Sequence, residues 1–359
     1  MEQKQKKKYI QIVIISIVII LVSLSTIFNS QISSKIRQWL FKADIKVSND
    51  DLVVHFISVG QGDAIAISCP NGEIMLIDAG PKKSQNKLIN YIKDKVITSN
   101  NDLEIDYLLL SHPDTDHSGG MCAIFEEFEI KNFFRPNIAS FSENVLDFAM
   151  VSDLTEYNQV INASEREQNM TTNVIVGQYE FNMGDVLVEI FAPLRVYSTT
   201  NQMSPIVKVS YLGKSFLFTG DIQDESERDM ILNLENTLDA DVLKVAHHGS
   251  SRSTSEEFVR LVTPQYAVIS VGTNSYGHPH MSTINTLQNN NIEIYTTQSN
   301  SIVFVCGRDF FGVINNKTHS FEFVDWWVIV LVINGVLLFV LVKQIIKMVL
   351  DRKKDFNID

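Results

Sequence analysis

The sequence predicts an α/β domain that lies between two membrane-spanning helices, and three observations support this prediction. Short runs rich in Val, Ile, Leu and Phe alternate with segments of helical periodicity between residues 50 and 320. Two long apolar runs, each sufficient to cross a bilayer, lie on either side of this region. Several predicted strands end in Asp and His residues, which are common metal ligands, so the domain also contains a candidate site.

The first apolar run covers residues 9–29 and follows a basic tail, residues 1–8, with four lysines. Its length and the lack of a small-x-small cleavage pattern favour an uncleaved anchor over a signal peptide, which is the alternative. The second run covers residues 325–346, and Lys and Arg residues follow it in the tail 347–359. Because positive charge flanks the outer end of both runs, the positive-inside rule places both termini in the cytoplasm and residues 50–320 outside the cell membrane.

The predicted domain is strongly acidic. The chain has 30 Lys and Arg and 42 Asp and Glu residues. Residues 1–40 and 326–359 hold 11 of the basic and four of the acidic residues, which leaves 19 basic and 38 acidic residues between 41 and 325, a net charge of −19. A broad basic surface that binds nucleic acid through its phosphates is therefore not expected. The three cysteines are widely spaced and predict neither a disulfide framework nor a zinc ribbon.

The strands and helices expected in the domain follow from hydrophobic periodicity and turn residues. Residues 30–49 are expected to form a linker, and Asn71-Gly72 predicts a hairpin turn. Strands are expected at residues 51–59, 64–68, 73–77, 105–110, 132–134, 174–176, 178–181, 186–191, 206–212, 215–218, 242–246 and 266–271. Helices are expected at residues 87–97, 121–128, 256–262 and 283–288, and within the polar segment 140–170, which we interpret as a lid or insertion. His55, on the first strand, is expected to pack in the sheet.

The strongest candidate site is Ser111-His-Pro-Asp-Thr-Asp-His117, which directly follows a predicted strand. It offers four metal ligands within six residues: His112, Asp114, Asp116 and His117. A helix start capped by Asp116 or Ser118 is the structural alternative, but it leaves both histidines unexplained. Imidazole together with carboxylate favours Zn, Mn or Fe over Ca or Mg.

Three further turns carry candidate residues. Asp221 follows a predicted strand, and a carboxylate in this place can bridge two cations. The adjacent His247 and His248 also follow a strand. Their side chains are expected to point in different directions, so that one of them binds metal, and the sequence leaves open which one. His278 and His280 lie on a loop before a helix and are candidate proton donors to a leaving oxygen, with a chance placement on the surface as the alternative.

These motifs occur in a fixed order with several others. The ordered set is Val59-Gly-Gln-Gly-Asp63, Leu76-Ile-Asp-Ala-Gly80, Ser111-His-Pro-Asp-Thr-Asp-His117, Phe218-Thr-Gly-Asp221, Leu243-Lys-Val-Ala-His-His-Gly-Ser250 and Tyr276-Gly-His-Pro279. The central motif resembles the His-x-His-x-Asp-His signature of the metallo-β-lactamase fold, with Asp114 at the second His position. Over residues 50–314 the set resembles the metallo-hydrolase domain of the ComEC/Rec2 family of DNA-uptake proteins.

The resemblance implies a four-layer αβ/βα sandwich. It also implies that Asp78 orients a metal ligand. Asn201 and Ser204 stand near the place where many relatives have a histidine ligand, so this metal position is expected to be poor in protein ligands. Lys244 and Ser250 belong to a matching motif and are expected beside the metals or the substrate.

Two divalent ions, Zn or Mn, are expected. The residues expected around one ion are Asp116, His117, Asp221 and one of His247 and His248. The residues expected around the other are His112, Asp114 and Asp221, with Asn201 nearby. Water shared by the ions is the expected nucleophile, so Asp116 and the candidate acids His278 and His280 are the expected catalytic residues.

The expected reaction is metal-dependent hydrolysis of a phosphodiester, and the resemblance favours extracellular DNA as the substrate. One alternative is a phosphodiesterase that acts on head groups of the cell envelope. Another is a non-catalytic receptor or assembly subunit of a membrane complex. The chain offers two spanning segments and not the polytopic channel that ComEC-like proteins carry, so a separate channel protein is an expected partner if the chain serves DNA import.

Overall fold

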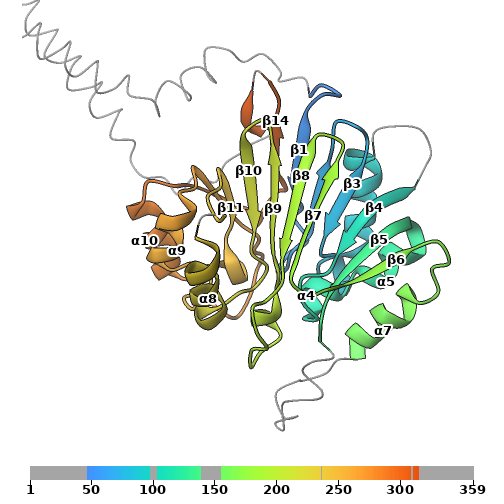
Figure 1. Ribbon diagram of the computed structural model, residues 1–359, viewed down its shortest axis with the longest axis horizontal. Helices are drawn as coiled ribbons and strands as arrows, with labels where there is room; N and C mark the ends of the chain where they lie inside the picture. The colour runs from blue at the N-terminus through green and yellow to red at the C-terminus, as the bar shows by residue number, and fades with distance from the viewer. Residues whose placement is uncertain (1–46, 98–102, 139–154, 236, 309, 315–359) are drawn as a thin grey trace, which may run out of the picture. The chain divides into compact units, whose positions relative to one another are not determined.

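The computed structural model describes residues 47–97, 103–138, 155–235, 237–308 and 310–314. They form an α/β unit built on two β-sheets (Figure 1). The segments 9–29 and 325–346, which are expected to span the membrane, lie outside these ranges. Within the described ranges, no helix is both long enough and apolar enough to cross a bilayer.

The first sheet has eight strands in the spatial order β15-β14-β1-β2-β3-β4-β5-β6. Their bounds are β1 Leu52–Phe56, β2 Ile65–Ser68, β3 Ile74–Ile77, β4 Glu104–Leu109, β5 Glu129–Pro136, β6 Thr171–Ile175, β14 Ile302–Cys306 and β15 Phe311–Ile314. Strands β3 to β6 run parallel, and the other neighbours pair antiparallel. The Asn71-Gly72 turn joins β2 to β3 in a hairpin, as expected.

The second sheet has seven strands in the order β13-β12-β11-β10-β9-β8-β7. Their bounds are β7 Gln178–Met183, β8 Val186–Phe191, β9 Ile206–Tyr211, β10 Lys214–Phe218, β11 Val242–Lys244, β12 Tyr266–Ile269 and β13 Glu293–Thr296. Strands β10 to β13 are parallel, and β7 to β10 are antiparallel. Each sheet therefore has a parallel part, and the turns that follow parallel strands gather at one edge of the sheet.

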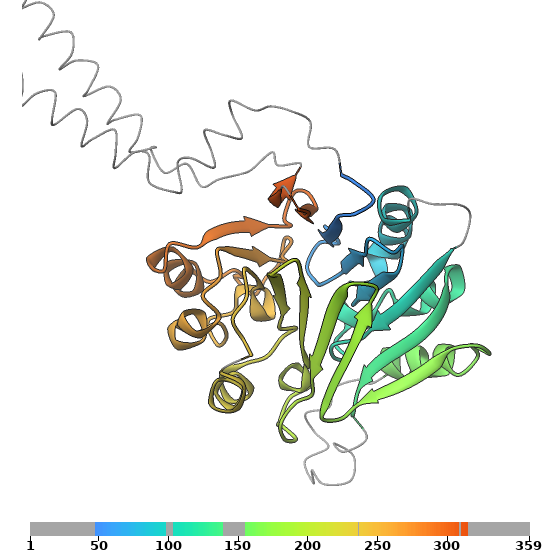
Figure 2. The ribbon, with the colours of Figure 1, turned by 45° about the horizontal axis from the view of Figure 1, so that its top comes forward.

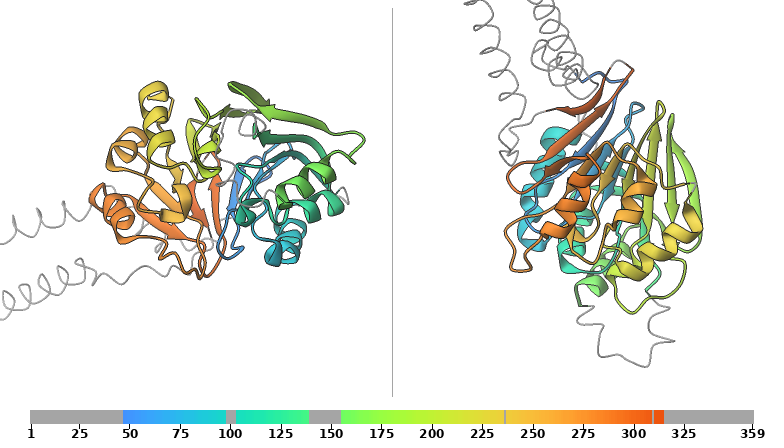
Figure 3. Two further views of the ribbon diagram at one scale, coloured as in Figure 1. Left: turned by 90° about the horizontal axis from the view of Figure 1, so that it is seen from below. Right: turned by 90° about the vertical axis from the view of Figure 1, so that its left-hand side faces the viewer.

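Helices cover the outer face of each sheet (Figures 2 and 3). Those on the first sheet are α3 Gln85–Tyr91, α5 Met121–Glu127 and α7 Thr155–Ser164. Those on the second sheet are α8 Asp224–Leu234, α9 Glu256–Val262 and α10 Met281–Asn289. The order helix, sheet, sheet, helix is the four-layer αβ/βα sandwich that the sequence predicted.

The two sheets pack against each other through their apolar inner faces. The ring of Phe56 on β1 lies 5.9 Å from that of Phe218 on β10, between centroids. The ring of Phe304 on β14 lies 5.9 Å from that of Phe216. All four rings are buried, and burying a phenylalanine stabilises a fold by roughly 1.5–3 kcal/mol. This packing fixes the turns of one sheet against those of the other.

Several elements differ from the expectation. Strand β5 is longer than residues 132–134, because Lys131 and Arg135 interrupt its apolar run while the backbone continues in the sheet. The helix expected at 87–97 is α3 followed by one turn of π-helix, Ile92–Val96. From the segment 140–170 the structure describes α7, and residues 139–154 lie outside the described ranges. Helix α8 and strands β13 to β15 were not predicted.

Candidate metal centre

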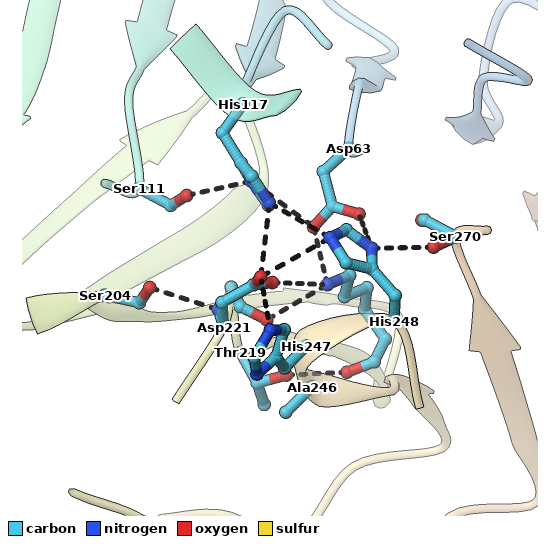
Figure 4. Close-up of polar contacts among 12 residues, drawn as sticks. Asp63, Ser111, His117, Ser204, Thr219, Asp221, Ala246, His247, His248 and Ser270 are labelled. Atoms are coloured by element: carbon cyan, nitrogen blue, oxygen red, sulfur yellow. Dashed lines mark hydrogen bonds and ion pairs between the residues drawn. The ribbon is translucent and has the colours of Figure 1, made fainter. Parts of the chain in front are cut away.

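Five turns bring polar side chains to the edge where the parallel strands end. Figure 4 shows side chains from both sheets pointing toward one another. The contributing turns and their residues are the β1–β2 turn with Asp63, the turn after β3 with Asp78, the turn after β4 with residues 112–117, the turn after β10 with Asp221, and the turn after β11 with His247 and His248.

The turn after β4 supplies two buried and two partly exposed residues. His112 and His117 are fully buried, whereas Asp114 and Asp116 reach solvent. The short helix α4, Thr115–Ser118, begins after Asp114, so Asp116 does not cap it. Instead the Asp116 Oδ2 lies 3.2 Å from the Nε2 of His248. The alternative of a purely structural helix cap is therefore wrong for Asp116.

Asp78 holds the ring of His117 in place. It is buried, has a left-handed φ of 60°, and accepts hydrogen bonds from the backbone and hydroxyl of Ser111 at 2.7 and 2.6 Å. The Nδ1 of His117 lies 2.7 Å from the Asp78 Oδ2. A carboxylate in this position fixes the tautomer of the ring, so that its Nε2 points into the centre.

Asp221 occupies the middle of the cluster. Its Oδ2 lies 3.4 Å from the Nε2 atoms of both His117 and His248, 3.8 Å from that of His247, and 4.0 Å from that of His112. The backbone N–H of Asp221 donates to the Ser204 Oγ at 3.1 Å, which fixes the turn. One carboxylate oxygen thus faces four imidazoles, an arrangement suited to a ligand shared by two cations.

The adjacent histidines point in different directions, as expected. Both have left-handed backbones, with φ of 47° at His247 and 53° at His248. The Nδ1 of His248 lies 2.8 Å from the carbonyl oxygen of Ser270, and its Nε2 faces Asp116. The Nε2 of His247 instead lies 3.3 Å from the Asn201 amide nitrogen. The structure therefore groups His248 with Asp116 and His117, and His247 with Asn201.

His112 and Asp114 form the other side of the cluster. The Nε2 of His112 lies 3.9 Å from the Asp114 Oδ2, and the Thr200 hydroxyl donates to the other oxygen of Asp114 at 2.6 Å. The Nε2 of His112 is buried and has no hydrogen-bond partner among the described residues. A buried acceptor without a partner is costly unless an ion satisfies it.

The tautomers of His117 and His248 support the same conclusion. The carbonyl of Ser270 can only accept, so the Nδ1 of His248 carries the hydrogen, and the Nδ1 of His117 donates to Asp78 in the same way. In the neutral rings each Nε2 atom then carries a lone pair instead of a hydrogen. The two Nε2 atoms lie 3.3 Å apart, and both also face the Asp221 carboxylate. This arrangement is unfavourable without a cation between them, so these residues fit a bound metal ion.

The pKa shifts of these residues also favour a positive charge in the cluster. Burial alone would lower the pKa of His117 and of His248, but Asp221 and the neighbouring carboxylates raise both. Burial would raise the pKa of Asp221, but His248 and His117 hold it well below its usual range. Burial lowers the pKa of His112, and His117 adds to the effect. The cluster therefore favours positive charge beside Asp221, whether from protons or from metal ions.

Lys244 lies behind the candidate metal ligands and pairs with Asp63, which was not among the predicted site residues. Both side chains are buried, and the Lys244 Nζ lies 2.5 Å from the Asp63 Oδ2 and 3.6 Å from the Asp221 Oδ1. The ammonium also donates to the Gly220 carbonyl at 3.0 Å. Asp63 comes from the first sheet and Lys244 from the second, so the pair connects the two halves beneath the cluster.

The remaining predicted residues lie around the rim. The ring of His278 is 5.3 Å from that of His247, and burial lowers the pKa of His278 to about 4. His280 accepts a hydrogen bond from the Ser251 N–H at 3.0 Å through its Nδ1 and so holds its own loop. Ser250 accepts a hydrogen bond from the Arg252 N–H and shapes the same region. Of these rim residues, only His278 has a ring contact with a candidate ligand within the described part of the chain.

The structure adds residues that the sequence did not single out. Asp63 stands in one of the matching motifs, so its position could have been noticed. Thr200 and Gln223 touch Asp114 and His247 through side chains that carry no distinctive spacing. The Ser270 contact uses a backbone carbonyl, which leaves no signal in the residue type.

Comparisons with known proteins identify relatives of this chain. ComE operon protein 3 of Bacillus subtilis (strain 168) is 28% identical over 265 residues, which cover 70% of this chain and 32% of that protein. Recombination protein 2 of Haemophilus influenzae is 27% identical over 255 residues, which cover 69% of this chain and 27% of that protein. The chain thus spans about a third of the length of these curated relatives. They are consistent with the ComEC/Rec2-like hydrolase domain that the sequence predicted.

A solved structure and a family model complete the comparison. The metallo-beta-lactamase fold protein YhfI from Bacillus subtilis has a TM-score of 0.46 and 12% identity, and covers 72% of this chain and 100% of its own. The family model of the metallo-beta-lactamase superfamily matches residues 57–273, more than half of the 359 residues. The chain therefore belongs to the metallo-beta-lactamase superfamily.

Proposed function

We propose that this chain is a metal-dependent phosphodiesterase that hydrolyses DNA. Membership of the superfamily supports a metal-dependent hydrolase. The observation that carries the proposal is the position of Asp221, with one carboxylate oxygen 3.4–4.0 Å from four imidazole nitrogens. A carboxylate shared by two cations is typical of enzymes that cleave phosphodiesters. DNA is the favoured substrate because one relative is named for recombination and because the ordered motifs resemble a DNA-uptake family.

Two groups of residues would hold the cations, which we take to be Zn or Mn. Asp116, His117 and His248 form one group, and His112 and Asp114 form the other, with Asp221 between them. His247 and Asn201 lie on the side of the second group, which has fewer protein ligands. Bound cations would supply an activated water and neutralise charge on the phosphate.

The protein itself orients these groups. Asp78 keeps the Nε2 of His117 aimed into the centre, and the Lys244 ammonium places a positive charge 3.6 Å from the Oδ1 of Asp221. The Nδ1 of His278 is buried without a hydrogen-bond partner within the described ranges. Because burial lowers the pKa of His278 to about 4, its ring is neutral near pH 7 and would stabilise a leaving oxygen by a hydrogen bond rather than act as a charged acid. The Nδ1 of His280 already accepts a hydrogen bond from Ser251. Between the two candidates we favour His278 as the hydrogen-bond donor.

The decisive experiment measures hydrolysis by the purified full chain with Mn²⁺, Zn²⁺ or chelator. The substrates are single-stranded DNA, duplex DNA and a panel of small phosphodiesters, including lipid head groups. We expect cleavage of single-stranded DNA that requires metal. Brisk turnover of head-group phosphodiesters without cleavage of any nucleic acid would move the assignment to the cell envelope. That second function is favoured by one observation, the net charge of −19 between residues 41 and 325.

Metal analysis tests the shared carboxylate. Asp221→Ala should lose hydrolysis and most of the bound metal, because it removes the ligand common to both groups. Asn201→Ala is the matched control and should keep most of the metal, since the Asn201 side chain hydrogen-bonds to His247 and is an amide rather than a carboxylate or imidazole. Wild-type metal stoichiometry in Asp221→Ala would contradict the bridging role.

We further propose that the domain lies outside the cytoplasm, held by residues 9–29 and 325–346 as membrane helices. A hydrolase in that place would act on DNA before or during its passage across the membrane. Import would then require a separate channel protein as partner. A non-catalytic subunit is the remaining alternative, and absence of metal-dependent turnover on every substrate would favour it.

A further inference from the structure

We propose that Tyr276 and His278 form a stacking subsite for a nucleobase next to the scissile phosphate. The proposal rests on the proposed nuclease function and says how the protein would bind a base of the substrate. It concerns the loop between β12 and α10, whose tyrosine has no part in the metal centre. Its basis is a row of aromatic rings that leads from the cluster to the surface.

The row begins at the metal centre. The Nε2 of His247 lies 3.8 Å from the Asp221 Oδ2. The ring of His278 follows at 5.3 Å from the ring of His247, and that of Tyr276 at 5.8 Å from the ring of His278. Exposure rises along the row, from a largely buried His247 to Tyr276, which is 70% exposed. A nucleotide whose phosphate sits at the centre can extend its base along these rings.

Hydrogen bonds hold the backbone of the loop, although its tyrosine is exposed. The Asn274 Oδ1 accepts hydrogen bonds from the N–H groups of Tyr276 and His278, at 3.0 and 3.1 Å. The Asn274 amide donates to the carbonyls of Gly272 and His278, both at 2.9 Å. A Cβ on Gly272 would lie 2.4 Å from the backbone of Gly60. The backbone at the start of the loop therefore packs directly against the β1–β2 turn. An aromatic ring on such a fixed backbone loses little entropy when a ligand stacks on it.

Charge gives a reason for such a subsite. Proteins that bind nucleic acid through phosphates need clustered Lys and Arg, but residues 41–325 carry a net charge of −19. Stacking of bases on aromatic rings depends little on charge and contributes roughly 5- to 160-fold in affinity for each base. In a duplex the faces of the bases are already stacked, so this subsite selects single-stranded DNA.

The test compares substrates with and without bases. The full chain is assayed on oligothymidylate and on an abasic oligonucleotide of the same length. Tyr276→Ala should raise the KM for oligothymidylate about tenfold with little change in kcat, and the loss should be confined to the substrate that carries bases. Tyr276→Phe keeps the ring and should behave like the wild type. Leu212→Ala removes a side chain that is 51% exposed at the opposite end of β10 and is the matched control.

A spectroscopic measurement separates this inference from the nuclease proposal. The three tryptophans of the chain are Trp39, Trp326 and Trp327, so a tryptophan at position 276 would be the only one between residues 47 and 314. In Tyr276→Trp, oligothymidylate should quench this fluorescence and the abasic oligonucleotide should not. That quenching would support the subsite even if no nucleic acid were cleaved. Absence of quenching, or an equal KM for Tyr276→Ala and wild type, would overturn it.

Discussion

Lys244 is a buried cation whose charge is balanced by two aspartates. Burial by itself would lower the pKa of Lys244, but Asp63 and Asp221 raise it. Lys244→Met would leave Asp63 buried without its partner, and breaking a buried pair in this way costs about 3–5 kcal/mol. We expect the free energy of unfolding to fall by that amount in urea titrations with chelator present.

The control for this variant is an ion pair near the surface. Lys93 pairs with Glu127, and both side chains are about one-third exposed. Lys93→Met should cost less than about 1 kcal/mol, because solvent screens such pairs. Equal losses in Lys93→Met and Lys244→Met would show that the buried pair has no special role.

His55, on a strand of the first sheet and not among the candidate ligands, is expected to make the fold sensitive to acid. It is 6% exposed on β1, its Nδ1 lies 3.1 Å from the Tyr91 hydroxyl, and burial lowers its pKa from 6.5 to about 4. It packs in the sheet, as the sequence predicted. Between these pH values the unfolded chain binds the proton and the folded chain does not, so stability falls as the pH drops.

The expected loss from His55 is about 1.4 kcal/mol per pH unit between pH 6.5 and 4. His55→Gln removes this titration and should flatten the curve of unfolding free energy against pH by that slope. Tyr91→Phe removes the hydrogen bond but keeps the imidazole. Its unfolding free energy should therefore still fall steeply between pH 6.5 and 4. A curve for His55→Gln as steep as that of the wild type would refute the assignment.

The β1–β2 turn supports the turn after β4, which carries candidate metal ligands, by close backbone contact. The N–H of Asp63 donates to the carbonyl of Asp116 at 3.2 Å. Gly62 has a φ of +134°, and a Cβ there would lie 2.2 Å from the same carbonyl oxygen. No side chain fits between these turns, which explains why the turn needs glycine at this point.

We therefore expect Gly62→Ala to lower both metal content and stability. Gly72→Ala is the matched control, because Gly72 also has a positive φ but no atom lies within 4 Å of the added Cβ. Gly72→Ala should cost only the backbone strain, about 1–3 kcal/mol, and keep its metal. Metal analysis and urea unfolding of the two variants give the comparison. Similar metal contents would mean that the turn contact does not shape the site.

Local patterns predicted the elements that depend on local residues. The hairpin at Asn71-Gly72 and the strand before His112 follow from turn chemistry and an apolar run, and both are confirmed. Pairing of β14 with β1 joins Phe56 to Ile302, far apart in the sequence, and periodicity does not encode such partners. Strand β13 is only four residues long and two of them are partly buried, so its pattern is weak.

At the scale of the whole molecule, the sequence indicated which residues would gather in one cluster. It did not indicate how they divide between the two groups of candidate ligands. The ordered motifs predicted a cluster around Asp221, and its carboxylate does lie among the predicted histidines. The grouping of His248 with Asp116 depends on two consecutive left-handed residues and on the Ser270 carbonyl. Asp63 stands in one of the ordered motifs, but its pairing with Lys244 is a contact between the two sheets, which the motif does not indicate.

The arrangement across the membrane gives the last prediction. Lysine clusters flank the outer end of both apolar segments, so both termini should lie in the cytoplasm and the domain outside it. A reporter enzyme that is active only outside the cytoplasm should be active when fused near residue 140 and inactive when fused after residue 359. A reporter restricted to the cytoplasm should give the opposite result at both positions. Cytoplasmic activity at residue 140 would overturn this topology and would place the centre away from extracellular DNA, while the geometry of the metal ligands would stand unchanged.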